Sequence, residues 1–568
     1  MATRHRSSSR PTSTLLLLAA ALGGCGGGAP DSGSQSRNNR LVASLRSEPT
    51  GLDPFLTIDG PSVTVMDLLN GSLISFDEVR QEPRLDLAES LDVSADGRVL
   101  SVRLRPGLRF SDGTPCEPED VLSSFAALLD AERASPLRPQ LIVDGRPVEV
   151  SLAADRTLRF ELAAPVASVE RLLDGIPILA RGMAAASAQW SLATPPDRIA
   201  GMGPFRFRRH VPGQRIELER NPHYWRVDAA GGRLPYLDEL VFQVVASPEA
   251  EVMLFSAGEI DVISSLSAHS FEVLERHHGD RVRMWDVGPG LRFMFLLFNL
   301  NESTANAPSG PFVGSWFRRR EFRQAVSLAV DREAIARLVF RGRAVPIASH
   351  ETPGSRFWWD PVSRPPPRSL PEARRLLERS GFSWGSGGRL LDPEGRPVEL
   401  TALVSAKNPD RPPAAELIRE DLRGIGVELN AVSLTHGALV RRVLTTGEFD
   451  AAVLELGGGD PDPNAHLPIL LSSGRLHLWQ LAGRPLFGWE RTLDELMLRQ
   501  LAARAPEERR RLYVEVQRIV AEQLPFVPLV SPHVLVGARR GLLGFEPAAT
   551  GHPALWNADT LRWESAPP

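Results

Sequence analysis

Alternation of strand-like and helix-like apolar segments is the feature that most limits how this chain can fold. In its second half, Leu400–Val404 predicts a strand, Ala415–Leu422 a helix, and Val427–Leu429 the next strand after Gly426. Strands and helices that alternate along a chain are typical of α/β architectures. The chain has 568 residues, enough for two or three domains. We therefore expect a multidomain α/β protein.

One local pattern occurs twice, which suggests two related lobes. Met253–Ile263 is echoed by Val443–Val453, and each stretch predicts a helix end, a glycine cap and an apolar strand. The caps are Gly258 and Gly447. Two explanations stay open here. Either the lobes share a duplicated unit, or glycine followed by an acidic residue simply ends helices often.

The first half of the chain carries strand and hairpin signals. Leu41–Leu45 predicts a short strand, and Leu100, Val102 and Leu104 alternate with polar residues behind an Asp-Gly turn. Phe205–Leu218 predicts a hairpin whose Pro-Gly turn, at 212–213, suits a type II turn.

The amino terminus predicts export. Three arginines precede residue 11, Leu15–Leu22 is a short apolar run, and two glycines lead to Cys25. This arrangement resembles the lipobox of bacterial lipoproteins, which implies cleavage before Cys25 and acylation of that residue. We therefore expect a signal peptide at 1–24 and a flexible tether at 25–39. The alternative is an ordinary signal peptide with a chance cysteine.

The net charge argues against a nucleic-acid partner, and the cysteine content argues against an intrachain disulfide. Loss of the signal peptide takes the net charge from -4 to about -7, which argues against nucleic acid as a partner. The cysteines are Cys25 and Cys116, so a lipid on Cys25 leaves no intrachain disulfide. We expect no cofactor and no metal; the adjacent His277 and His278 do not share a helix face.

Six segments in order along the chain carry a family resemblance. The sequences FSDGTPCEPEDV at 110–121 and GMGPFRFRRHVPGQRIELERNPHYWR at 201–226 resemble the two best-known signatures of the family 5 solute-binding proteins. Segments 322–339, 370–382, 448–474 and 513–536 are also similar to that family. These proteins are the peptide- and nickel-type substrate-binding components of ABC importers, and the resemblance covers about 40–565.

The resemblance implies an architecture. We expect a two-lobed, periplasmic-binding-protein-like α/β fold with an extra α/β subdomain inserted in the first lobe. Lobe I would span 40–288, with the insertion at about 56–197, and lobe II would span 289–510. The segment 511–568 would return to lobe I, and the very apolar strand Phe293–Phe298 would cross between the lobes.

The resemblance also implies a ligand site. In peptide-binding relatives, an aspartate shortly before an acidic-Pro pair binds the ligand's free amine. If Asp462-Pro463 is that pair, the aspartate's place falls on Gly459, and Asp460 lies one position later. Asp460 and Asp462 are therefore our candidates for the charge, and Gly459 would let the ligand approach the backbone. The alternative is a rigid turn with solvated carboxylates.

Five further residues are candidate ligand contacts. Trp479 and Trp489 follow the acidic loop and would line side-chain pockets, although core packing is as good an explanation. Asn299 ends the apolar strand, where a turn role is the alternative. Ser47 and Glu48 lie in the first loop, which faces the cleft in relatives.

The implied function is solute capture without chemistry. A hydrolase is the competing class, but the chain has neither a G-x-S-x-G nor an H-E-x-x-H motif. We expect a monomeric lipoprotein of the cell envelope, anchored by lipid and facing the periplasm or the outer side of the membrane. It would deliver oligopeptides or similar solutes to an ABC permease. Relatives with the same fold also handle nickel chelates, haem, opines and oligosaccharides.

Overall fold

The computed structural model describes residues 39–458 and 460–564. The predicted signal peptide, Cys25, Gly459 and nearly all of the predicted tether therefore lie outside the described residues. Among the residues that are described, no helix is long and apolar enough to cross a membrane.

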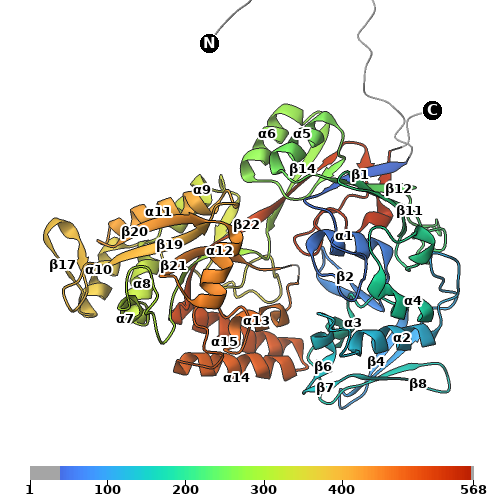
Figure 1. Cartoon of the computed structure of the whole chain (residues 1–568), viewed down its shortest axis with the longest axis horizontal. Coiled ribbons are helices and arrows are strands. Elements are labelled where there is room, and N and C mark those ends of the chain that lie inside the picture. Colours follow the sequence, from blue (N-terminus) through green and yellow to red (C-terminus); the bar gives the residue numbers. More distant parts are fainter. Residues whose placement is uncertain (1–38, 459, 565–568) are drawn as a thin grey trace, which may run out of the picture. The chain divides into compact units, whose positions relative to one another are not determined.

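A four-stranded sheet forms close to the start of the described chain (Figure 1). Its order is β1 (Arg40–Leu45), β12 (Glu239–Val244), β11 (Arg215–Arg220) and β10 (Phe205–Val211). β1 runs parallel to β12, whereas β10, β11 and β12 are antiparallel neighbours. The first described strand thus pairs with one that follows it by about two hundred residues, and the part of the chain between β1 and β10 is an insertion into this sheet.

A second four-stranded sheet lies inside that insertion. It is fully antiparallel, in the order β4 (Ala88–Val93), β5 (Val99–Leu104), β9 (Leu158–Glu161) and β8 (Glu149–Leu152). Helix α2 (Pro118–Leu129) buries the apolar side chains that recur along one of its faces. Residues of both four-stranded sheets share one hydrophobic core.

The largest sheet belongs to the second half of the chain. Its main path is β13 (Val262–Ile263), β22 (Phe526–Arg539), β15 (Phe293–Phe298), β21 (Ala451–Leu456), β19 (Glu399–Ser405) and β20 (Glu428–Leu434). Strands β14 (Val282–Pro289) and β16 (Ala344–Pro346) also pair with β22. Strands β19, β20 and β21 are parallel, and α11 (Arg411–Arg423) connects β19 to β20 as an α/β unit requires.

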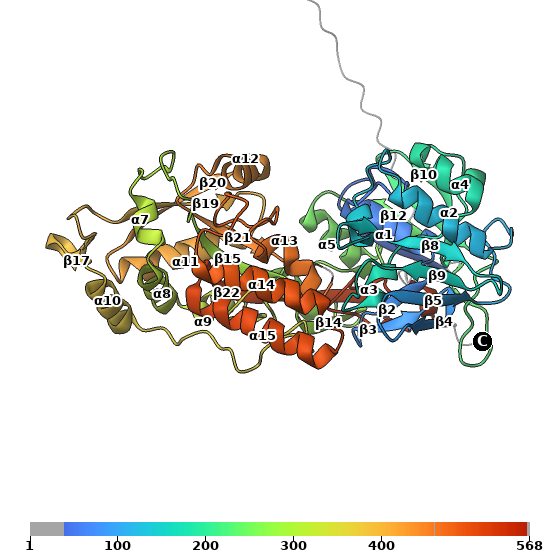
Figure 2. The ribbon, with the colours of Figure 1, turned by 90° about the horizontal axis from the view of Figure 1, so that it is seen from below.

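Helices cover this sheet and complete a second hydrophobic core. α14 (Gly488–Ala502) and α15 (Pro506–Gln523) pack side by side in both views (Figures 1 and 2). The other helices are α1 (Gly60–Leu69), α3 (Val169–Leu173), α4 (Arg181–Ala186), α5 (Pro248–Ala257), α6 (Ala268–His278), α7 (Val313–Phe317), α8 (Arg320–Ala329), α9 (Arg332–Leu338), α10 (Leu370–Arg379), α12 (His436–Arg441) and α13 (Leu467–Leu470). The remaining short strands are β2 (Ile74–Asp77), β3 (Glu82–Leu85), β6 (Ile142–Val143), β7 (Arg146–Pro147), β17 (Ser383–Trp384), β18 (Leu390–Leu391), β23 (Leu542–Leu543) and β24 (Arg562–Trp563).

The two signature segments contact one another and the end of α1. The backbone N–H of Ser111 donates to the carbonyl of Gly201 at 2.8 Å. A Cβ atom at Gly201 would lie 2.0 Å from the carbonyl oxygen of Leu69, and one at Gly203 would lie 2.3 Å from that of Leu68. Only glycine permits this approach of two backbones. The signature therefore fixes the position of α1.

Local predictions from the sequence are confirmed at several elements. The strands expected at 41–45 and 100–104 are β1 and β5, and the hairpin expected at 205–218 is β10 and β11. Gly258 ends α5 in the left-handed conformation, with a φ of 85°. Gly447 also has a positive φ, but it follows a π-helical turn, and β13 is much shorter than β21. The internal duplication stays a prediction.

Two observations bear on the expected lobes. The strand Phe293–Phe298 does not cross between cores, because all six of its side chains are buried within the second core. The boundary at 510/511 falls inside α15, whose buried residues also pack in that core. The chain returns to the first core within β22, at Ala538. All of the proposed lobe boundaries stay predictions.

Candidate functional site

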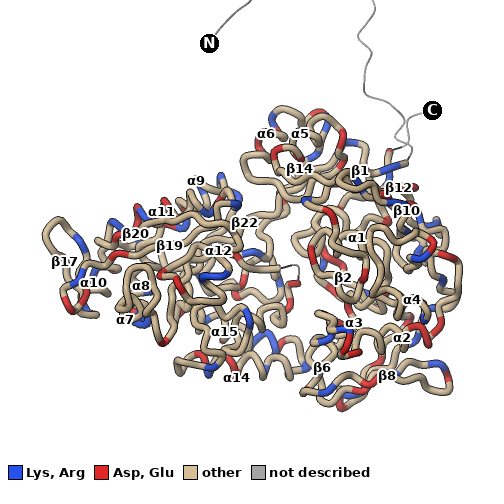
Figure 3. Tube along the Cα trace, viewed as in Figure 1, with Lys and Arg blue, Asp and Glu red and all other residues tan. Residues whose placement is uncertain are grey.

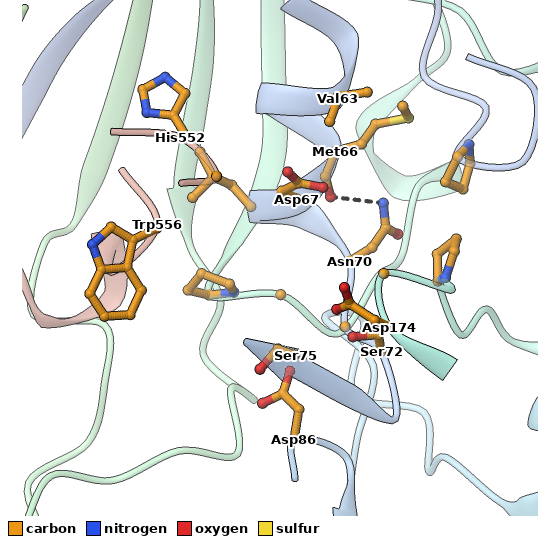
Figure 4. A pocket seen from close by; sticks show the side chains of 18 of the residues that line it. Val63, Met66, Asp67, Asn70, Ser72, Ser75, Asp86, Asp174, His552 and Trp556 are labelled. Atoms are coloured by element: carbon orange, nitrogen blue, oxygen red, sulfur yellow. Dashed lines mark hydrogen bonds between the residues drawn. The ribbon is translucent and has the colours of Figure 1, made fainter. Parts of the chain in front are cut away.

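A cavity of about 440 Å³ lies in the half of the structure built around the first core (Figure 4). Its walls come from α1, from the β2–β3 hairpin and its flanks, from the turn after α3, and from a late segment at 551–559. The end of α1 is fixed by the glycine contacts described above. An isolated β-bridge between Ile74 and Asp174 joins two of the other walls. The cavity is thus assembled from segments far apart in the sequence.

The cavity wall is strongly acidic. Among the described residues that line it, five are acidic and two are arginines: Asp67, Glu78, Asp86, Asp174 and Asp559, with Arg84 and Arg226. Arg226 is already paired with Asp559, at 2.6 Å between Nη1 and Oδ2. Arg84 donates to the hydroxyl of Ser75 at 3.0 Å. Both arginines lower the pKa of Asp86 by their charge, although burial raises it more. Two arginines therefore face five carboxyl groups in this wall.

Asp67, Asp86 and Asp174 come from three separate segments around the same space (Figure 4). One buried oxygen of Asp86, Oδ1, has no hydrogen-bond partner among the described residues. Asp67 lies in the last turn of α1, where the partial negative charge of the helix end disfavours a carboxylate. Figure 3 marks acidic positions in red beside α1 and β2.

The crowding of carboxyl groups changes their protonation. Burial raises the pKa of Asp67 to about 7, and the charge of Glu78 adds to the effect. The Asp67 side chain is nevertheless exposed, and solvent contact weakens this effect of burial. Burial also raises the pKa of Asp174 to about 7; Arg171 opposes this rise, while Asp460, Glu78 and Asp67 add to it. These groups lack enough positive charge, which a cationic ligand would supply.

Asp460, one of the candidates from the sequence, lies close to this acidic group without lining the cavity. Its Oδ1 is 2.5 Å from Nη1 of Arg171, and the side chains are 41% and 14% exposed. The Arg171 guanidinium lies over the ring of Phe76, 3.6 Å from the ring centre. Arg171 thus places a positive charge beside the cavity. That charge pairs with Asp460 and also acts on Asp174.

Asp462 lies in a different environment. Both of its carboxylate oxygens face the guanidinium of Arg509, at 2.6 and 2.5 Å. Both side chains are more than nine-tenths buried. Oδ1 also accepts the backbone N–H of Asn464 at 2.9 Å. The charge of Asp462 is therefore already matched inside the protein, and its contact with a ligand stays a prediction.

The two tryptophans are part of an aromatic cluster. Trp479 is 1% exposed, and its indole N–H donates to Oε1 of Glu490 at 2.7 Å. Trp489 is half-buried and stacks on Phe487, with ring centres 5.5 Å apart. These contacts give Trp479 a packing role, and ligand contact by either tryptophan is untested.

The remaining candidates also lie away from the cavity. The Asn299 amide is fully buried and donates to the carbonyls of Gly447 and Phe449 at 2.9 and 2.7 Å. Glu48 lies against His210, at 2.6 Å, and this contact lowers the pKa of the Glu48 carboxyl. Ser47 is exposed beside it. Among the sequence-derived candidates that the structure describes, none lines the acidic cavity, and the roles of all candidates toward a ligand stay predictions.

Comparison with known proteins decides the family. A family profile described as "Bacterial extracellular solute-binding proteins, family 5 Middle" matches residues 82–476, well over half of the chain. The chain belongs to this family. The family resemblance inferred from the sequence is therefore confirmed. Because this is a family of non-enzymatic solute-binding proteins, the hydrolase alternative is rejected.

Individual relatives of this family 5 protein are distant but match along most of its length. A probable ABC transporter-binding protein of Deinococcus radiodurans is 25% identical over 512 residues, covering 85% of each chain. Di/tripeptide-binding protein 1 of Pseudomonas aeruginosa is 24% identical over 541 residues, covering 90% of this chain and 92% of the relative.

Solved structures confirm the fold class. The ABC transporter substrate-binding protein CtaP of Listeria monocytogenes has a TM-score of 0.76 at 22% identity, covering 93% of this chain and 99% of its own. The predicted periplasmic-binding-protein fold is therefore correct. Similar proteins are named for, or hold, different solutes: haem in Haemophilus influenzae, and Ni(L-His) in Campylobacter jejuni. The ligand of this family 5 protein does not follow from its family.

Sequence reasoning missed the acidic cavity. Asp67, Glu78 and Asp174 sit in no shared motif, and no spacing along the chain brings them together. A weak signal exists at Asp174, where an aspartate precedes a glycine whose φ is 64° at the end of a short helix. That pattern predicts a turn, and it does not predict what the turn faces.

Proposed function

We propose that this protein is the substrate-binding lipoprotein of an ABC importer, and that its solute is an oligopeptide or a similar small molecule with a cationic group. The family supplies the solute-binding role. The acidic cavity, lined by five carboxyl groups and two arginines of which one is paired with Asp559, is the observation that favours a cationic group.

The energetic reason is charge matching. Taking an ammonium group out of water is costly unless carboxylates replace its hydration. Asp67 and Asp174, whose pKa values burial raises to about 7, are held near other acids without enough positive charge. A bound cation would stabilise the ionised forms of both. The binding energy then depends on charges that are unfavourable in the free protein.

Peptides fit this requirement better than two of the alternatives. Every unblocked peptide carries an α-ammonium, and similar proteins are named di/tripeptide-binding proteins. Haem brings two carboxylates of its own, and a neutral oligosaccharide brings no charge, so an acidic wall favours neither. A nickel chelate or an opine remains an alternative ligand of the same fold.

The ligand can be identified directly. Mass spectrometry of small molecules released from the purified protein should find solutes with an amine or guanidine. Calorimetry with an alanine-only peptide then isolates the α-ammonium, because N-acetylation removes its only cation. We expect acetylation to weaken binding about 10- to 100-fold, as for loss of one buried charged hydrogen bond of ~1–3 kcal/mol.

Variants assign this effect to the cavity. Asp67→Asn and Asp174→Asn should each weaken binding of the free peptide and reduce the difference between free and acetylated forms. Asp92→Asn, an exposed residue of β4 outside the cavity, is the matched control. If the released solutes carry no cationic group, or if both cavity variants bind like the parent, the proposed ligand class is wrong.

Anchoring is a separate part of the proposal. Lipidation of Cys25 would hold the protein at the membrane beside its permease, since two or three acyl chains give stable attachment. Mass spectrometry of the mature amino terminus should find acylated Cys25, and Cys25→Ser should release the protein or leave it uncleaved. An unmodified Cys25 in the native host would contradict the anchor.

A further inference from the structure

A second polar cluster is buried beside the large sheet. His350, Glu351 and His466 each offer a ligand atom, and these atoms all lie within 4.8 Å of one another. The three residues are 0%, 2% and 6% exposed. His350 and Glu351 follow β16, whereas His466 ends a short turn, Pro463–His466, that precedes α13. None of them lines the acidic cavity.

The hydroxyl of Tyr513, from α15, lies at the centre of this cluster. It is 2.7 Å from Oε2 of Glu351, 2.8 Å from Nδ1 of His466 and 3.0 Å from Nε2 of His350. Glu351 Oε2 and His466 Nδ1 are themselves 3.7 Å apart. Two imidazoles, one carboxyl and one phenol thus converge on one point.

One ring nitrogen of His350 is not used by the protein's own contacts. Its Nε2 faces the Tyr513 hydroxyl, whereas its Nδ1 is buried and has no hydrogen-bond partner within the described chain.

Among the described residues around the cluster, aromatic rings pack against the proposed ligands and the nearby cation is already paired. The ring of Phe293 packs against His466 and that of Trp358 against Tyr513, each with ring centres 6.4 Å apart. Arg509 is the nearby positive charge, and its guanidinium is engaged by Asp462. An apolar shell around nitrogen and oxygen donors is the usual setting of a bound metal.

We propose that His350, Glu351 and His466 bind a divalent transition-metal ion of the zinc class, with the Tyr513 hydroxyl as a fourth contact. In a tetrahedral site with metal–nitrogen distances of ~2.0–2.1 Å, neighbouring ligand atoms lie roughly 3.3 Å apart. The distances from Glu351 Oε2 to the Tyr513 hydroxyl and to His466 Nδ1 are 2.7 and 3.7 Å, which lie on either side of that value. Two imidazoles with one carboxylate favour zinc or its neighbours over calcium and magnesium, which prefer oxygen alone.

The ion has a consequence for the candidate ligand loop. His466 follows Asp460 and Asp462 within a few residues, and it would be joined through the metal to α15 and to the segment after β16. The metal would therefore stabilise the turn that begins after Asp462.

Metal content of the purified full-length mature protein tests the proposal. After EDTA treatment and reloading with Zn²⁺ alone, elemental analysis should find about one ion per chain, and the ion should raise the melting temperature by mass action. His466→Asn and Glu351→Gln should reduce the bound zinc about tenfold or more. His477→Asn is the matched control, because His477 is equally buried in another cluster, against Glu490.

Two further measurements keep the test decisive if a variant fails to fold. Co²⁺ added to the EDTA-treated wild-type protein should give the visible absorption of a tetrahedral site, and Tyr513→Phe should weaken Zn²⁺ binding while keeping the ring. Wild-type protein that takes up neither ion at micromolar concentration overturns the proposal. So does zinc that persists in His466→Asn but is lost in Asp67→Asn/Asp174→Asn, since that ion would belong to the acidic cavity.

Discussion

Asp462 and Asp67 are both aspartates beside other charged groups, and they lie in opposite electrostatic situations. Asp462 meets Arg509 through two short contacts, and both side chains are almost completely buried. Asp67 lines the acidic cavity beside Glu78 and has no ion pair with an arginine among the described residues, and desolvation raises its pKa to about 7. The first arrangement is complete within the protein, whereas the second is incomplete until a cation enters.

This difference separates structural charge from functional charge. A buried ion pair can be close to neutral for stability as a whole, yet removal of one partner leaves the other unpaired and is costly. A group of unmatched carboxylates has the opposite property, because removal of one relieves repulsion in the free protein. Function that needs a strained, charged site is therefore expected to lower stability there.

The largest expected effect follows from the Asp462–Arg509 pair. Asp462→Asn should lower the free energy of unfolding by ~3–5 kcal/mol, because it leaves the Arg509 guanidinium buried without a counter-charge. Urea unfolding monitored by circular dichroism measures this change, with Asp92→Asn as the exposed control. Asp67→Asn should leave stability unchanged or slightly higher. If Asp462→Asn and Asp67→Asn lower the free energy of unfolding equally, the Asp462–Arg509 pair and the cavity carboxyls do not differ in the way described.

An intermediate effect concerns pH and isolates the cavity carboxyls. Asp67 and Asp174 have folded pKa values of about 7, above their ordinary value of 3.8, so between these values the folded chain holds more protons than the unfolded chain. Stability therefore falls as pH rises through this interval. Relative to Asp67→Asn/Asp174→Asn, the wild-type protein should lose a few degrees of melting temperature between pH 5 and pH 8.

The comparison with the double variant is needed because other groups titrate in the opposite sense. Burial lowers the pKa of His466 to about 4 and holds that of His350 below its usual value. As pH falls below the ordinary histidine pKa of 6.5, both histidines therefore lower the stability of the folded chain. This contribution is the same in the wild type and in the double variant. Parallel curves for the wild type and the double variant would show that the cavity carboxyls titrate normally.

Much of the fold was accessible from the sequence because local signals and family signatures agree. The strands β1 and β5, the β10–β11 hairpin and the cap at Gly258 follow from alternation, turn residues and glycine. The signature at 201–203 has a physical cause, since its glycines touch the α1 backbone. By contrast, α15 crosses a proposed boundary because its packing partners are distant in sequence.

The candidate site was less accessible, again for a physical reason. The Asp-Pro-Asp-Pro loop drew attention as a compact acidic motif, but the sequence does not reveal that Arg509 and Arg171 lie opposite its two aspartates. The cavity acids, in turn, become a site only when α1, the β2 region and the turn at Asp174 meet. Whether the acidic loop or the cavity carries unmatched negative charge depends on which residues meet in the folded chain, and no sequence motif gives that information.

The smallest expected effect concerns the Arg171–Asp460 pair, which lies between these extremes. Its carboxylate is 41% exposed, so solvent screens the interaction, and Asp460→Asn should change the free energy of unfolding by less than ~1 kcal/mol.

Arg171 also opposes the rise in the pKa of Asp174, so Arg171→Gln should raise that pKa further. Carboxyl NMR titration of Asp174 in Arg171→Gln and Asp460→Asn measures both shifts. Removal of the arginine should move the midpoint up and removal of Asp460 should move it down, because these two charges act on Asp174 with opposite signs. Shifts in the same direction would mean that Arg171 is not the cation that serves the cavity.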